Sequence, residues 1–165
     1  MRKSYKGILL SPPTYNYKLS KNMKLKNYSF SLALAHSDLS GYNVCPMANR
    51  ISTGENNPRK STCSSVCVAK NGNGRYESTM NARIKKTKRF FEDRTSFMAD
   101  LVADIRFAIE WSNYHGYVAS FRLNAYSDIR WETIEAQDGK TLYELFPDVT
   151  FYDYTKLVNR TTEDN

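Results

Sequence analysis

A polar, glycine-containing stretch from residue 37 to residue 75 constrains the fold of this chain more than any other feature, because it has little helical or strand periodicity. A loop of this length is uncommon inside a compact domain unless something holds it in place. The stretch contains all three cysteines of the chain, Cys45, Cys63 and Cys67. We therefore predict that a loop over residues 36–75 folds around a metal ion or an iron–sulfur cluster bound by these thiolates.

The spacing of the cysteines suggests how such a site would form. Cys63 and Cys67 can bind one ion from a single turn of chain, and the more distant Cys45 closes the loop. A structural zinc site requires a fourth protein ligand, for which His36 is nearest in sequence. A [4Fe-4S] cluster could instead leave one iron open to a substrate or cofactor. The alternative interpretation is three ordinary thiols of the kind that protein cores often bury.

The N-terminal sequence MRKSYKGILLSPP lacks the apolar core and the small-residue cleavage site of a signal peptide. The chain also contains no run of eighteen apolar residues. We therefore expect a cytoplasmic protein without a membrane partner. Because thiols stay reduced in the cytoplasm, an odd number of cysteines favours metal ligands or free thiols over a disulfide framework.

The charge of the chain is divided unequally between its two halves. Residues 1–90 carry 17 Lys/Arg and 3 Asp/Glu, whereas residues 91–165 carry 7 Lys/Arg and 14 Asp/Glu. The net charges are therefore +14 and −7, consistent with +7 for the whole chain. This asymmetry favours an anionic partner for the first half, with a nucleic acid or nucleotide as the first candidate. The alternative is a solvated basic face that only keeps the chain soluble.

The first 27 residues are rich in lysine and tyrosine, and Pro12 and Pro13 disfavour a helix there. We predict that residues 1–27 form a basic extended arm whose tyrosines stack on bases while its lysines neutralise phosphates. Tyrosines that pack this arm onto the domain are the alternative. We expect residues 161–165 to form a short tail.

Residues 28–160 are expected to form a single α/β domain with a partial parallel sheet or a partial barrel, because strands and helices alternate. The expected strands cover residues 28–34, 117–123 and 149–154, and the expected helices cover residues 76–91, 95–115 and 131–145. The second helix should begin at a Thr95-Ser96 cap and bury Phe97, Leu101, Ile105 and Ile109, which follow at four-residue steps.

The first of these helices is amphipathic and strongly basic. Its polar side carries Arg83, Lys85, Lys86, Lys88 and Arg89. We predict that this face contacts the phosphates of a nucleic acid through the first four of these side chains.

Polar side chains follow two of the expected strands. Asn124, Ser127 and Asp128 come after the strand at 117–123, and Tyr154 and Lys156 end the last strand. Ligands of parallel sheets bind at the carboxyl ends of the strands, so we expect these side chains to lie side by side. Asp128 is the candidate acid, base or polar anchor, although a helix cap is the more common role for such an Asp. Lys156 is the candidate group that orients an anionic ligand.

Several short motifs occur in a recognisable order. They are Cys45-Pro46, Cys63, Cys67, Arg122-Leu-Asn-Ala-Tyr-Ser-Asp128 and Phe151-Tyr-Asp-Tyr-Thr-Lys156. This order resembles the phage gene-product-88-like family over about residues 28–160. The sequence Tyr126-Ser127-Asp128 departs from the Ser-Gly-Asp of many relatives, which puts close backbone approach to a ligand there in doubt.

The resemblance implies a phage protein similar to reduced radical-SAM or iron–sulfur barrels. It implies a cluster at the three cysteines, with Asp128 and Lys156 at the same end of a partial barrel, and SAM as a further cofactor. The cysteine spacing is not the compact C-x3-C-x2-C of radical-SAM enzymes.

Two hypotheses follow from these observations. In the first, a phage-encoded metal- or iron–sulfur-binding protein acts on a nucleic acid or nucleotide in the host cytoplasm. In the second, the metal is only structural, and the protein is not an enzyme but binds a host protein or nucleic acid to inhibit or redirect it.

Overall fold

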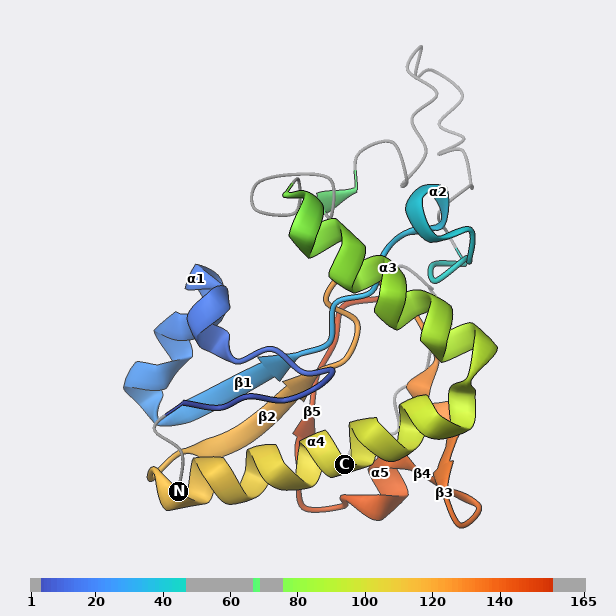
Figure 1. Ribbon diagram of the computed structural model, residues 1–165. Helices are drawn as coiled ribbons and strands as arrows, with labels where there is room; N and C mark the ends of the chain where they lie inside the picture. Colours follow the sequence, from blue (N-terminus) through green and yellow to red (C-terminus); the bar gives the residue numbers. More distant parts are fainter. Residues whose placement is uncertain (1–3, 47–66, 69–75, 156–165) are drawn as a thin grey trace, which may run out of the picture.

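A parallel three-stranded sheet lies at the centre of the protein (Figure 1). The computed structural model describes residues 4–46, 67–68 and 76–155 of the 165-residue chain. The strands are β1 (Asn27–Ser31), β2 (Val118–Arg122) and β5 (Thr150–Phe151), in the spatial order β1-β2-β5. The expected single α/β domain with a partial parallel sheet is thus confirmed, and the strands of the described residues form no closed barrel.

The register of the sheet gives it one aromatic and one polar face. All five residues of β1 pair with β2 from Asn27 opposite Val118 to Ser31 opposite Arg122, and Phe121 of β2 pairs with Phe151 of β5. Successive strand side chains point to opposite faces. The aromatic face carries Tyr28, Phe30, Phe121 and Phe151, and the polar face carries Ser29, Ser31, Ser120 and Arg122.

The described part of the connection from β1 to β2 contains two long helices after the short helix α2 (Ser37–Ser40). They are α3 (Glu77–Glu92) and α4 (Arg94–Tyr114). The expected Thr95-Ser96 cap is wrong by two residues, since the carboxylate of Asp93 accepts the backbone N–H of Ser96 at 3.3 Å and caps α4. Gly116 follows the end of α4 with φ +74°, a left-handed conformation that favours glycine at the end of a helix.

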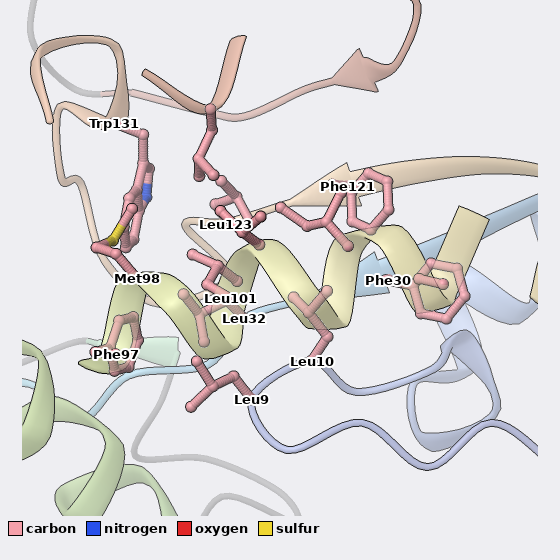
Figure 2. Close-up of a cluster of buried hydrophobic side chains, with 14 of the residues drawn as sticks. Leu9, Leu10, Phe30, Leu32, Phe97, Met98, Leu101, Phe121, Leu123 and Trp131 are labelled. Atoms are coloured by element: carbon pink, nitrogen blue, oxygen red, sulfur yellow. The ribbon is translucent and has the colours of Figure 1, made fainter. Parts of the chain in front are cut away.

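Helix α4 provides much of the core, in which Phe97, Leu101 and Ile105 are fully buried. Side chains of α4, β1, β2 and the N-terminal segment belong to the same cluster (Figure 2). Ile109 is only partly buried. Each four-residue step overshoots a helical turn of 3.6 residues, so the fourth side chain of the predicted stripe rotates away from the core. Ala108 and Trp111 are buried in its place.

The N-terminal segment differs from the predicted extended arm. Its described part contains three short helices, η1 (Pro13–Tyr15), α1 (Tyr17–Ser20) and η2 (Lys21–Leu25). Pro13 occupies the first position of η1, where a proline is tolerated because that N–H needs no partner. Among the tyrosines of residues 1–27, Tyr5 is 3% exposed whereas Tyr15 and Tyr17 are both 78% exposed, so the packing alternative holds for Tyr5 alone.

A buried acid holds this segment against α4. The Asp104 carboxylate is 5% exposed and accepts the backbone N–H groups of Ile8, Leu9 and Leu10 at 3.0, 2.6 and 2.9 Å. Gly7 passes so close that a Cβ there would lie 2.8 Å from Asp104 Oδ2. The segment therefore belongs to the core of the domain.

The connection from β2 to β5 is not the predicted helix at 131–145. It contains η5 (Trp131–Thr133), a hairpin of β3 (Glu135–Gln137) and β4 (Lys140–Thr141), and the short helix α5 (Leu142–Leu145). Asp138 and Gly139 have φ of 53° and 76° and form the hairpin turn. An Asp-Gly pair is a strong hairpin signal, and it outweighs the helical spacing of the neighbouring apolar residues. No helix in the described part of the chain is long and apolar enough to span a membrane.

Candidate functional site at the carboxyl edge of the sheet

The three strands end at one edge of the sheet, which faces α3 (Figure 1). The chain that follows each strand contributes to this carboxyl edge. The backbone N–H of Ala125, after β2, donates to the carbonyl of Leu32, after β1, at 3.2 Å. Thr155, after β5, donates its hydroxyl to Asp128 Oδ2 at 3.1 Å. The segments after β2 and β5 that were expected to meet therefore do so.

Asp128 lies at the centre of this edge and is 6% exposed. Its carboxylate accepts the Thr155 hydroxyl, and its backbone N–H donates to the carbonyl of Val44 at 2.8 Å. The helix-cap interpretation is wrong, because η5 begins at Trp131 and has Arg130 at its N-cap without a side-chain cap. Lys156, the other predicted catalytic residue, lies outside the described residues.

The predicted substrate-binding residues Asn124 and Ser127 make their hydrogen bonds inside the loop. The Asn124 side-chain oxygen accepts the hydroxyl of Ser127, the backbone N–H of Ile129 and the indole N–H of Trp131 at 2.8, 3.0 and 3.1 Å. Its amide nitrogen donates to the carbonyl of Ile129 at 2.9 Å. Asn124 therefore holds together the turn that carries Asp128.

The cysteine-bearing loop begins beside this turn. The thiol of Cys45 is half-buried and donates to the carbonyl of Tyr126 at 3.8 Å. Cys67 is also half-buried, and Cys63 lies outside the described residues. His36 is 5% exposed, and its Nδ1 lies 3.7 Å from a carboxylate oxygen of Asp38.

The described residues test only part of the predicted metal site. Among them no three His, Cys, Asp or Glu side chains form a group that could hold a metal ion. His36, Cys45 and Cys67 are consequently not assembled as a three-ligand set in this part of the chain. A zinc ion or an iron–sulfur cluster that also uses Cys63 stays a prediction.

The predicted basic face of α3 is divided between two sides of the helix. The guanidinium of Arg83 stacks over the Tyr126 ring at 4.3 Å, next to the carboxyl edge. Lys86, one turn later on the same side, donates to the carbonyl of Leu9 at 2.6 Å. Burial lowers the pKa of Lys86, and the nearby Asp104 carboxylate opposes that shift. Lys85 and Lys88 are exposed on another side of the helix, since side chains share a side every three or four residues.

A second arginine at this edge received no role from the sequence. The guanidinium of Arg122, at the end of β2, stacks over the ring of Tyr154 at 5.0 Å, and Tyr154 is 73% exposed. One sequence feature could have identified Arg122: it lies at the end of a predicted strand between Phe121 and Leu123, which are both buried. A charged residue at such a position faces away from the aromatic core.

Comparison with known proteins gives one match. The family model described as gene product 88 matches residues 8–165, which is nearly the whole chain. That description contains no reference to radical-SAM or iron–sulfur proteins. No curated protein and no solved structure matches the chain.

Proposed function

The chain belongs to the gene product 88 family of phage gene products, and from this premise we propose that it binds and acts on a nucleic acid or nucleotide at the carboxyl edge of its sheet. One observation carries the proposal. Two arginine–tyrosine pairs, Arg83 with Tyr126 and Arg122 with Tyr154, lie at this edge. Tyr126 is two residues from the buried Asp128, and Tyr154 is next to Thr155, which donates to the Asp128 carboxylate.

Each arginine–tyrosine pair offers the two groups that recognise a nucleotide. A guanidinium binds phosphate oxygens through its fork of N–H donors, and an aromatic ring stacks on a base. The net charge of +14 over residues 1–90 supports this assignment, because it attracts a polyanion to the half of the chain that contains α3.

Asp128 is the proposed acid, base or polar anchor. Its carboxylate is almost fully buried, and the Thr155 hydroxyl fixes its orientation. A carboxylate held in this way can take or give a proton only at a ligand atom within hydrogen-bonding distance. Lys156 follows Thr155 directly in the sequence, and we assign it the role of orienting an anionic group of the ligand.

Binding of a labelled oligonucleotide tests this function. We expect Arg83→Gln to weaken the binding of a fluorescent single-stranded oligonucleotide about tenfold in an anisotropy titration, because a charge-assisted hydrogen bond to phosphate is lost. Lys140→Gln is the matched control, since it removes one exposed charge from the β3–β4 hairpin. Equal affinities of the two variants would remove Arg83 from the site. A parent protein that binds no nucleic acid would favour the host-protein alternative.

We also propose that Cys45, Cys63 and Cys67 bind a zinc ion or an iron–sulfur cluster that fastens the cysteine-bearing loop beside Asp128. The support is the position of the Cys45 thiol against the Tyr126 carbonyl, two residues from Asp128. The described residues supply two of the three thiols, so we derive no chemical step through the metal.

Metal analysis of anaerobically purified protein tests this second proposal. We expect about one equivalent of zinc without colour, or iron with a brown absorbance, and a loss of both metal and folding stability when all three cysteines are changed to serine. Protein that contains neither metal and tolerates the triple change would refute the metal site. That result would leave the nucleic-acid proposal standing.

A further inference from the structure

Three side chains form a row across the polar face of the sheet at its carboxyl end. The register pairs Ser31 of β1 with Arg122 of β2. On the other side, Tyr152 directly follows Phe151, the partner of Phe121, and its backbone N–H donates to the carbonyl of Phe121 at 3.0 Å. The rings of Phe121 and Phe151 pack together on the aromatic face, and the chain stays paired at Tyr152, so the residue that follows each ring lies on the polar face. We call Ser31, Arg122 and Tyr152 the donor row.

The donor row contains buried polar atoms that no described residue satisfies. Within residues 4–46, 67–68 and 76–155, Arg122 Nε and Tyr152 Oη are both buried without a hydrogen-bond partner. Among the described residues the Arg122 guanidinium also forms no ion pair, and it stacks on the ring of Tyr154. Buried polar groups are nearly always hydrogen-bonded in native proteins, and each exception requires an explanation.

The rest of the polar face shows that this lack of partners is local. Close to the beginning of the strands, the hydroxyls of Ser29 and Ser120 lie 2.7 Å apart. The Ser120 hydroxyl donates to the side-chain oxygen of Asn27 at 2.7 Å, and that of Ser29 donates to the same oxygen at 3.0 Å. The unsatisfied donors are therefore confined to the carboxyl end, where ligands of parallel sheets bind.

We propose that the donor row binds a phosphate group, and that the exposed ring of Tyr154 stacks on a base attached to it. This inference rests on the proposed function and names the ligand group that the site holds. All three side chains of the row can donate hydrogen bonds, and none is acidic, which selects an oxyanion. A phosphate offers three oxygens to a guanidinium and two hydroxyls, whereas a carboxylate offers only two.

The stacking of Arg122 on the Tyr154 ring supports a site that is preorganised for its ligand. An arginine side chain loses considerable conformational freedom when it binds, and a ring at 5.0 Å restricts the guanidinium before the ligand arrives. Because Tyr154 remains 73% exposed, its ring is available to a base on the other side.

The test follows the Nε–H resonance of Arg122 by NMR in the nitrogen-15-labelled full-length protein, identified by its loss in Arg122→Gln. Inorganic phosphate, adenosine monophosphate and acetate are titrated separately at constant ionic strength. We expect this resonance to move with phosphate and the mononucleotide but not with acetate, and the mononucleotide to bind about fivefold more tightly because of stacking. Arg122→Gln should weaken mononucleotide binding about tenfold and Tyr152→Phe about threefold.

Arg130→Gln is the matched control, because it removes an exposed arginine that pairs with Glu132 on the surface. It should leave mononucleotide affinity within about twofold. Equal responses to acetate and phosphate, or unchanged affinity in Arg122→Gln, would overturn the proposal.

The oligonucleotide titration separates this proposal from the proposed function. An oligonucleotide that binds the parent and Arg122→Gln equally would refute the donor row and leave nucleic-acid binding intact. Phosphate binding at Arg122 without oligonucleotide binding would refute the nucleic-acid function and retain the donor row. A parent that binds neither would refute both.

Discussion

Asp104 and Arg122 are two charged residues of the same small domain that differ in how far the domain satisfies their hydrogen-bonding groups. Asp104 is buried under the N-terminal segment, and its carboxylate accepts three backbone N–H groups from residues 8–10. Arg122 lies at the carboxyl edge of the sheet, and its buried Nε has no hydrogen-bond partner in the part of the chain that the structure describes. Backbone donors of the same chain therefore satisfy the Asp104 carboxylate, whereas no described residue satisfies the buried Nε of Arg122.

This difference separates structural charges from candidate ligand-binding charges. A buried carboxylate that satisfies three backbone donors contributes to stability, because those donors would otherwise be buried without partners. A cation without such partners costs stability and is explained only if something outside the chain supplies the acceptor. Removal of each charge should therefore change stability in opposite directions.

The largest effect is expected at Asp104. Asp104→Asn replaces one accepting oxygen with an NH2 group that faces backbone N–H donors, so we expect a loss of about 3 kcal/mol in the free energy of unfolding. Glu110→Gln, an exposed acid on the same helix, is the control and should change stability by less than about 0.5 kcal/mol. Urea denaturation of both variants measures the difference. Similar losses in the two would mean that the Asp104 contacts do not anchor the N-terminal segment.

The sequence predicted the features that depend on local periodicity. The apolar stripe of α4, the parallel pairing of β2 with β5 and the meeting of Asp128 with the segment after β5 follow from spacing and strand direction. The Asp104 anchor was missed because its partners lie 94 to 96 residues away in the chain. A single-residue signal existed, since Asp104 interrupts the buried side of α4 between Leu101 and Ile105. An acid at such a position requires a buried partner.

The sequence likewise predicted only part of the candidate site. Strand order placed Asp128 at the carboxyl edge, but it gave no means to distinguish side chains that bind a ligand from those that hold the loop. Asn124 was predicted to bind substrate, yet its oxygen accepts three hydrogen bonds from the turn itself. Arg122 begins the motif Arg122-Leu-Asn-Ala-Tyr-Ser-Asp128. Only the contacts of the folded sheet show that its Nε has no hydrogen-bond partner among the described residues.

A smaller effect is expected at the turn that carries Asp128. Asn124→Ala leaves three donors without their common acceptor, and we expect it to lower the free energy of unfolding by about 2 kcal/mol. Ser127→Ala removes only one of these hydrogen bonds and should cost about 1 kcal/mol or less. Thermal denaturation of the two variants compares them. Equal losses would place Asn124 outside the structural network and return it to the ligand-binding residues.

The smallest effect is expected at Arg122, and its sign decides the comparison. Arg122→Met keeps an unbranched apolar stem that reaches as far as the position of Nε, while it removes the guanidinium. The loss of stacking on Tyr154 costs about 0.5–1 kcal/mol, whereas burial of Nε without a partner costs about 1–3 kcal/mol in the parent. We therefore expect the variant, measured by urea denaturation without added anions, to be as stable as the parent or slightly more stable. A loss of unfolding free energy as large as that of Asp104→Asn would show that Arg122, like Asp104, stabilises the fold. The reason to assign a ligand to Arg122 would then disappear.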